Sequence, residues 1–169
     1  MASSIRIQEV TTRRDLLAFV KFPWRVYKGD PNWVPPLISE RLDYLNPEKN
    51  PFYQHAEVAL FLARRGREVV GTIAPFINDL AIRHFNEEVG GFGFLEVIQD
   101  YAVAERLLDT ARQWVKARGM TILRGPTNFT HNDTPVCSLR ALTARPLCWP
   151  LTRRPTTRPS SSVTAWKNS

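Results

Sequence analysis

One segment of the chain restricts the fold more than any other, because it predicts two neighbouring strands and the turn between them. The sequence AEVALFLARRGREVVGTIAPFIN, residues 56–78, contains two apolar runs, 58–63 and 69–77, on either side of RRGR. Gly66 lies in this short link, and glycine favours the tight turns that join antiparallel strands. The segment therefore predicts a β-hairpin, so the fold must contain an antiparallel pair of strands here.

The segments around the hairpin predict both strands and helices. Residues 4–10 alternate apolar and polar side chains, which predicts a strand. The next segment predicts a helix that Thr11 or Thr12 caps and that Pro23 limits or bends. A short second helix is predicted to end near Asn46–Pro47, and VGGFGFLEVI predicts a further strand.

The clearest helix pattern lies at residues 100–119, where apolar residues recur on one helical face. Asp100 is the predicted N-cap, and Gly119 is the predicted stop. A short strand in MTILRGP follows. Because a strand, a helix and a second strand in succession favour a parallel pair with a right-handed crossover, the sheet is predicted to be mixed. The expected fold class is α/β, with a mostly antiparallel sheet and flanking helices.

The positive charge of the chain is concentrated at its C-terminal end. The 169 residues carry a formal net charge of +7. Residues 1–133 contain 17 Lys and Arg against 16 Asp and Glu, whereas residues 134–169 contain 6 basic and no acidic residues. Binding of nucleic acid through the arginines of this tail is therefore an expected weak and non-specific property, not an evolved role. These arginines are Arg140, Arg145, Arg153, Arg154 and Arg158.

Several other classes of protein are not indicated. The N-terminal segment lacks the apolar core of a signal peptide, and no apolar run approaches the roughly 20 residues that span a bilayer. Both cysteines, Cys137 and Cys148, lie in the tail. His55 and His84 have no partners at the spacing of metal ligands. The expectation is a cytoplasmic protein without a membrane partner, a disulfide scaffold or a metal.

With this order of elements, residues 5–133 resemble the N-terminal part of the GNAT (N-acetyltransferase-like) superfamily. The more specific likeness is to a bacterial group of large GNAT-like proteins. It rests on KFPWRVYKGDPNWVPPL, NPFYQHAEVALFLA, GFGFLEV and RGMTILRGPTNFTHND, which occur at Lys21–Leu37, Asn50–Ala63, Gly91–Val97 and Arg118–Asp133. The resemblance implies an acyl-CoA N-acyltransferase-like fold that is incomplete at its C-terminus in this chain, because the last helix and two strands of the family would be missing.

The resemblance also implies roles for particular residues. Glu96 lies on the strand where some GNAT enzymes carry a general base that deprotonates the attacking amine. A cosubstrate, acetyl-CoA or another acyl-CoA, is expected to contact Leu95, Val97, Tyr101 and Ala102. The acceptor is expected to be a small-molecule amine, bound by Trp24, Tyr27, Trp33 and Asn128. Together these expectations describe an acyl-CoA-dependent N-acyltransferase.

Each of these patterns has a structural interpretation as well. Trp24, Tyr27 and Trp33 could form a packed corner between a helix and a loop, and Glu96 could be a solvent-facing charge. The run from Asn128 to Asp133 is typical of a polar loop with Asx turns. GGFGF at Gly90–Phe94 lacks the Lys-Ser/Thr of a phosphate loop, and it is interpreted as a strand packed closely against backbone.

One departure from the GNAT pattern concerns the cosubstrate. GNAT enzymes bind the acyl-CoA pyrophosphate at a Gly-rich loop before a helix, where free N–H groups attract negative charge. The corresponding segment, EVIQDYAVAERL, has no glycine and no basic residue before Arg106. As a cap, Asp100 would occupy those N–H groups and repel the anion. The alternative function is therefore a non-catalytic binding module on a GNAT-like scaffold.

The tail is predicted to be a separate segment. Residues 1–133 form the predicted GNAT-like domain, and residues 134–169 are expected to be disordered. Read one nucleotide out of frame with permitted codons, the residues after Thr134 give GLLVEGFDSPA, which resembles the continuation of the related bacterial proteins. A frameshift near Thr134–Pro135 is therefore the hypothesis for this tail. It implies a truncated protein that is inactive or weakly active.

Overall fold

The predicted hairpin forms the centre of a mixed sheet. The computed structural model describes residues 4–129. Five strands lie in the order β1-β3-β4-β5-β6, and a sixth, β2, also pairs with β4. All pairs are antiparallel except that of β5 with β6. The strands are β1 (Ile5–Glu9), β2 (Ala56–Val58), β3 (Phe61–Arg65), β4 (Glu68–Asn78), β5 (Val89–Val97) and β6 (Ile122–Arg124).

The hairpin has one long arm and one interrupted arm. β4 is continuous over 11 residues, whereas the predicted single strand 58–63 is divided into β2 and β3. Both parts pair with β4, through Val58 opposite Phe76 and Phe61 opposite Ile73. Gly66 in the turn has φ 62°, a left-handed conformation that glycine adopts without a steric penalty. The antiparallel hairpin is therefore confirmed, although its first arm is interrupted between β2 and β3 and its register with β4 shifts between Ala63 and Arg64.

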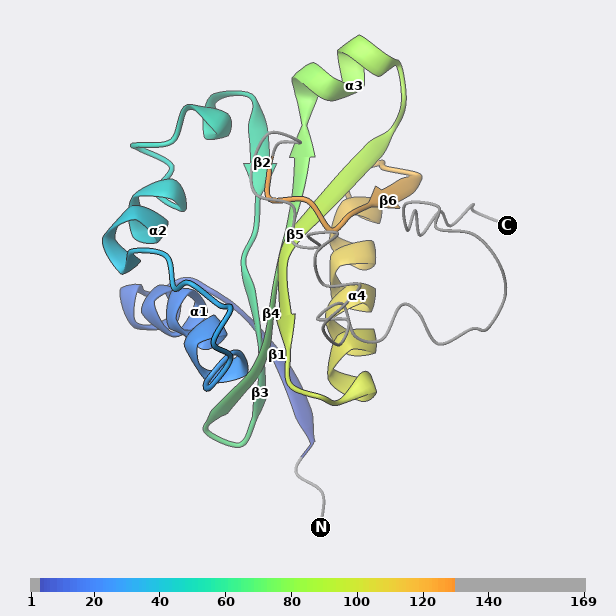
Figure 1. Ribbon diagram of the computed structural model, residues 1–169. Helices are drawn as coiled ribbons and strands as arrows, with labels where there is room; N and C mark the ends of the chain where they lie inside the picture. The colour runs from blue at the N-terminus through green and yellow to red at the C-terminus, as the bar shows by residue number, and fades with distance from the viewer. Residues whose placement is uncertain (1–3, 130–169) are drawn as a thin grey trace.

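Helices cover both faces of the sheet (Figure 1). α1 (Arg13–Val26) and α2 (Ile38–Tyr44) lie on one face, and α4 (Tyr101–Lys116) lies on the other. Thr12 caps α1 by accepting a hydrogen bond from the Asp15 amide, and Asp100 caps α4, as the sequence predicted. α1 continues through Pro23 and ends three residues later. The predicted α/β class with a mostly antiparallel sheet and flanking helices is confirmed.

A helix not predicted from the sequence, α3 (Asp79–Phe85), connects β4 to β5, and a short 3-10 helix precedes β2 at Pro51–Gln54. His84 and Phe85 form the end of α3. Asn78 caps α3 by accepting hydrogen bonds from the amides of Leu80 and Ala81. No residue of α3 is fully buried, although Ile82 packs against the cluster beneath α4, and seven residues are too few for a clear apolar stripe in the sequence.

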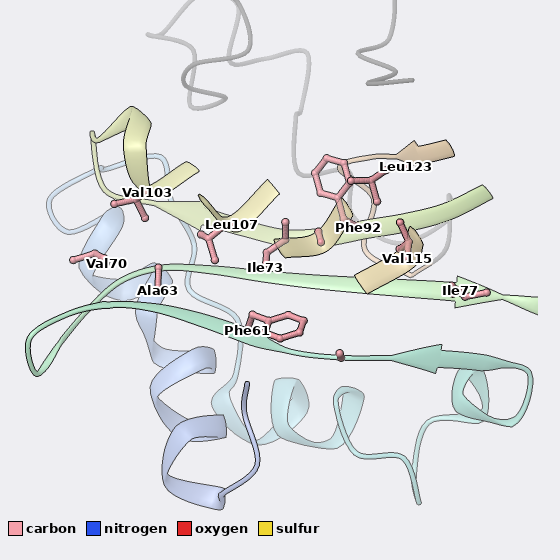
Figure 2. Packing of buried hydrophobic residues seen from close by; sticks show 12 residues of the cluster. Phe61, Ala63, Val70, Ile73, Ile77, Phe92, Val103, Leu107, Val115 and Leu123 are labelled. Atoms are coloured by element: carbon pink, nitrogen blue, oxygen red, sulfur yellow. The ribbon is translucent and has the colours of Figure 1, made fainter. Parts of the chain in front are cut away.

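Two apolar clusters fill the space on either side of the sheet. The cluster against α4 combines strand residues with Val103, Leu107 and Val115 of the helix (Figure 2). The cluster against α1 and α2 is aromatic, and its Phe52 and Phe129 rings stack with centroids 4.8 Å apart. Alternation along β3 separates the two, since Phe61 and Ala63 join the first cluster and Leu62 the second.

The parallel pair of β5 and β6 follows the predicted strand–helix–strand order, with Val89 opposite Ile122 and Gly91 opposite Arg124. The glycines of GGFGF lie inside β5 and not in a phosphate loop. A Cβ atom on Gly93 would lie 2.1 Å from the Thr127 carbonyl oxygen. The interpretation of this segment as a strand packed closely against backbone is therefore confirmed.

Several predicted features lie outside the described residues. They are His131, Asn132, Asp133, both cysteines, the tail arginines and the whole of 134–169. Within residues 4–129, no helix is both long enough and apolar enough to cross a membrane.

Candidate functional site

Glu96 and Tyr27 form the centre of the candidate site. Glu96 lies near the end of β5, on the face of the sheet that α1 covers, and Tyr27 follows α1 directly. The Tyr27 hydroxyl donates a hydrogen bond to Glu96 Oε2 at 2.6 Å, between residues 69 positions apart in the sequence. Both side chains are half-buried, so each keeps some surface toward solvent. The structure thus joins a predicted general base to a predicted substrate-binding residue.

The surroundings of Glu96 change its acidity. Burial raises the pKa of this carboxyl from the ordinary value of 4.5 to about 7, although the hydrogen bond from Tyr27 acts in the lowering direction. The pKa of Tyr27 is raised above its usual range by burial and then by the adjacent Glu96 carboxylate. Tyr27 is therefore a hydrogen-bond donor throughout the neutral range, whereas Glu96 can accept or release a proton near pH 7.

Aromatic rings form one side of this site. Tyr27 and Trp33 stack with centroids 5.2 Å apart, and Trp24 meets Trp33 edge-on at 5.4 Å. Trp33 belongs to the loop between α1 and α2, so this packing holds the loop against the end of α1. Val34 and Leu37 of the same loop are 83% and 69% exposed. The corner is packed, as the structural interpretation proposed, and it also lies next to Glu96.

β5 contains a bulge just before Glu96. Thr72 of β4 pairs with Glu96 and Ala74 pairs with Gly93, so Ile73 alone opposes both Phe94 and Leu95. Phe94 has φ 49°, in the left-handed region that side chains other than glycine rarely adopt. Asn128 is buried at 8% exposure, and its Oδ1 accepts a hydrogen bond from the Phe94 amide at 3.0 Å. This predicted substrate-binding residue therefore contacts the backbone of the strand that carries Glu96.

The residues predicted to bind the cosubstrate separate into two groups. The side chains of Leu95 and Val97 pack against the apolar cluster beneath α4. Tyr101 and Ala102 begin α4, and Tyr101 is 58% exposed. The structure therefore does not gather these four side chains around one ligand, and only the backbone of β5 could present Leu95 and Val97 to one.

The start of α4 already holds a carboxylate. Asp100 Oδ1 accepts a hydrogen bond from the Ala102 amide at 3.0 Å, and the other oxygen, Oδ2, pairs with Arg65 at 2.5 Å. The Arg65 guanidinium holds the pKa of Asp100 below its usual range. Asp100 thus caps α4 and occupies the Ala102 amide, as its capping position predicted.

Sequence reasoning missed Arg65 and Thr72. The alternation of side chains along β3 could have indicated the position of Arg65. Arg65 lies four positions after Phe61 and two after Ala63, so its side chain leaves the strand on the same face as theirs, toward α4. For Thr72 the signal was a hydroxyl inside the otherwise apolar run VVGTIAPFI. Thr72 is 1% exposed, and its Oγ1 donates to the Phe94 carbonyl at 2.8 Å.

Among residues 4–129, no group of three or more His, Cys, Asp or Glu could hold a metal ion.

The chain is similar in sequence to two curated proteins, although no protein-family model matches it. A bacterial ceramide synthase of Caulobacter vibrioides is 39% identical over 132 residues, which cover 78% of this chain and 34% of that protein. Protein YghO of Escherichia coli is 32% identical over 143 residues, which cover 79% of this chain and 36% of that protein. The chain therefore spans about a third of the length of the curated relatives it matches.

Solved structures resemble the described fold at low sequence identity. A tandem GNAT protein from the clavulanic acid biosynthesis pathway matches with a TM-score of 0.56 and 14% identity, over 71% of this chain and 35% of that one. An aminoglycoside acetyltransferase from an uncultured soil metagenomic sample, in complex with sisomicin, gives a TM-score of 0.52 and 14% identity, over 73% and 78%. This likeness shows the fold: the described part of the chain has a GNAT-like fold.

Proposed function

We propose that the protein is an acyl-CoA-dependent N-acyltransferase in which Glu96 is the general base. The observation that carries this proposal is the Glu96 carboxyl, which is half-buried on β5 of a GNAT-like fold and has a pKa of about 7. A base whose pKa lies near the working pH is available in its ionised form and still binds a proton well. The proposed substrates are an acyl-CoA thioester and a small-molecule amine.

The reaction assigns one proton transfer to this chain. The nitrogen of the neutral amine attacks the thioester carbonyl, so that a C–N bond forms and the C–S bond breaks. The proton that leaves the nitrogen passes to the Glu96 carboxylate, and the CoA thiolate leaves with the electron pair of the C–S bond. Tyr27 keeps the carboxylate in place through its hydrogen bond to Oε2. Trp33 and Trp24 would hold the apolar part of a substrate beside it.

The comparisons support an amide-forming reaction in general terms. The relative from Caulobacter vibrioides carries the name ceramide synthase, and a ceramide is an amide of a long-chain amino alcohol. The metagenomic structure is an acetyltransferase bound to an aminoglycoside, which is also an amine. The acceptor of this chain therefore belongs, by proposal, to the amines.

An assay of thiol release tests the proposal. Acyl-CoA and an amine are mixed with a purified parent chain in which the reading frame is restored after Asp133, and free CoA thiol and amide product are measured together. The Glu96→Gln variant keeps an oxygen that accepts from Tyr27 but cannot take a proton, so the rate is expected to fall about 10²-fold or more. Glu105→Gln, on an exposed position of α4, is the matched control and should keep the parent rate. Equal rates for Glu96→Gln and the parent chain would rule out Glu96 as the base.

A second function, a non-catalytic binding module, is favoured by Asp100. Its carboxylate occupies the Ala102 amide and places a negative charge where a pyrophosphate would bind. Isothermal titration of the frame-restored chain with acetyl-CoA separates the two functions: micromolar binding supports the enzyme, and no binding at millimolar ligand supports the module. Asp100→Ser keeps a capping hydroxyl and removes the charge, so it should tighten acyl-CoA binding if the enzyme proposal holds.

The proposal includes the reading-frame hypothesis for residues 134–169. The DNA sequence of the gene tests it directly, because stop codons or an unrelated peptide in the neighbouring frame would contradict it. If the hypothesis holds, a chain with the frame restored after Asp133 is expected to transfer acyl groups faster than the present chain, which should be inactive or weakly active.

A further inference from the structure

The bulge in β5 decides which face of the sheet Glu96 occupies. In a regular strand, residues two positions apart point to the same face, so Phe92, Phe94 and Glu96 would share one side. Phe92 packs in the cluster beneath α4. Phe94, however, packs with the aromatic cluster on the α1 face, and Glu96 contacts Tyr27 on that same face. The extra residue therefore moves Glu96 from the α4 side to the α1 side.

Two buried side chains bind the peptide groups of Phe94, the residue at which the alternation changes. Asn128 Oδ1 accepts from the Phe94 amide at 3.0 Å, and Thr72 Oγ1 donates to the Phe94 carbonyl at 2.8 Å. These bonds come from opposite neighbours of β5, since Thr72 lies in β4 and Asn128 follows β6. The amide and the carbonyl of Phe94, whose φ is unfavourable, thus form hydrogen bonds with the side chains of Asn128 and Thr72.

The segment after β6 is itself fixed at this place. The Thr127 amide donates to the Phe92 carbonyl at 2.8 Å, which extends the pairing of the parallel strands by one bond beyond β6. The Tyr44 hydroxyl donates to the Asn128 carbonyl at 3.2 Å. Gly93 leaves room for the Thr127 carbonyl, which a Cβ atom would meet at 2.1 Å. Asn128 is therefore held so that its side chain meets the bulge.

We propose that Thr72 and Asn128 are positioning residues that hold the β5 bulge and thereby turn Glu96 toward Tyr27. The role in the reaction rests on the proposed function of Glu96, whereas the effect on its orientation does not. Asn128, expected from the sequence to contact substrate, acts in this proposal through the strand backbone. Without the clamp, regular alternation would direct the Glu96 carboxyl toward the apolar cluster beneath α4, away from any solvent-borne substrate.

The test uses substitutions that remove one hydrogen bond at nearly constant volume. Thr72→Val removes the hydroxyl, whereas Thr72→Ser keeps the hydroxyl and removes only the methyl group. Asn128→Leu removes the acceptor for the Phe94 amide. Thr110→Val is the matched control, because the Thr110 hydroxyl donates to the Arg106 carbonyl at 2.8 Å on the exposed side of α4. Two NMR readouts follow the site: hydrogen exchange of the Phe94 amide and the pH titration of the Glu96 carboxyl carbon.

In Thr72→Val and Asn128→Leu, hydrogen exchange of the Phe94 amide is expected to become at least about tenfold faster. The pH midpoint of the Glu96 carboxyl titration is expected to differ from that of the parent chain. Thr72→Ser and Thr110→Val should match the parent chain. The proposal is overturned if both clamp variants are folded and keep the parent midpoint and exchange rate. It is overturned equally if Thr72→Ser is as altered as Thr72→Val, because loss of the hydroxyl would not be the cause.

The kinetic readout separates this proposal from the proposed function. If Glu96 is the base, Thr72→Val should lower kcat about 10-fold to 10²-fold and displace the acidic limb of the pH profile, with a smaller change in KM for acyl-CoA. If Glu96→Gln transfers acyl groups like the parent chain, the proposed function fails. The NMR midpoints then still decide whether Thr72 and Asn128 orient Glu96.

Discussion

Replacing Glu96 with glutamine should stabilise the fold at neutral and alkaline pH. The pKa of this carboxyl is raised from 4.5 to about 7 in the folded protein, mainly because the group is buried. Below about pH 4.5 the carboxyl is protonated in both the folded and the unfolded chain. Between these two values only the unfolded chain ionises, so the free energy of unfolding falls as the pH rises. Above about pH 7 this loss is complete.

The size of the loss follows from the difference between the two pKa values. One pKa unit corresponds to 1.36 kcal/mol, so a difference of about 2.5 units gives about 3 kcal/mol. Because Glu96 keeps some exposed surface, solvent screening reduces this value to about 2 kcal/mol. Glutamine is neutral at every pH and still accepts a hydrogen bond from Tyr27. The variant therefore avoids the loss without breaking this contact.

Urea unfolding at several pH values between 4 and 8.5 measures the effect. The difference between Glu96→Gln and the parent chain should grow by about 2–3 kcal/mol from pH 4.5 to pH 8, which corresponds to a Tm difference of roughly 4–12 °C. Glu105→Gln, at its exposed position on α4, should follow the parent curve. Parallel curves for Glu96→Gln and the parent chain would show that Glu96 ionises equally easily in the folded and unfolded states, and would refute the assignment of a neutral-range pKa.

Three further predictions concern contacts of the described residues. Tyr27→Phe removes a hydrogen bond that lowers the pKa of Glu96, so the acidic limb of the pH–rate profile should move upward by about 1 pH unit; an unmoved limb would contradict this. Gly93→Ala places a Cβ 2.1 Å from the Thr127 carbonyl and should destabilise the fold by about 2 kcal/mol or more in urea unfolding, whereas Gly71→Ala meets first the end of the Leu107 side chain, Cδ1 at 2.7 Å, and should be milder; a smaller loss for Gly93→Ala than for Gly71→Ala would contradict this. Asp15→Ala leaves the Arg64 guanidinium without the carboxylate that it binds at 2.9 Å and should cost about 3 kcal/mol by thermal unfolding; a loss near that of an exposed pair such as Asp43 with Lys49 would contradict it.

The elements with a strong local pattern could be predicted from the sequence. The hairpin around Gly66 and the helix that Asp100 begins carry their signals within about 20 residues, because a turn, a cap and an apolar stripe are local properties. The parallel pair of β5 and β6 followed from their connection through a helix. α3 could not be predicted in this way, since none of its seven residues is fully buried and its cap, Asn78, is its main local determinant.

The candidate site was predicted residue by residue but not as an arrangement. Glu96, Tyr27 and Trp33 were each identified through resemblance, yet their contact joins segments 69 positions apart and depends on how α1 packs on the sheet. The bulge was beyond any local pattern. Strict alternation from Phe92 would have placed Glu96 beneath α4, and only side chains from β4 and from the segment after β6 hold it elsewhere.

The bulge also makes the number of residues in β5 as important as their identity. Regular alternation over the four positions from Phe92 to Glu96 would direct the carboxyl into the apolar cluster that contains Phe92 and Leu107, whereas alternation over three positions would direct it to the α1 face. Deleting one residue between Gly93 and Glu96 should therefore remove the bulge and still leave Glu96 on the α1 face, facing Tyr27. The extra residue and the side chains of Thr72 and Asn128 that bind it thus act together, and a chain that lost the residue would no longer need those two side chains to orient Glu96.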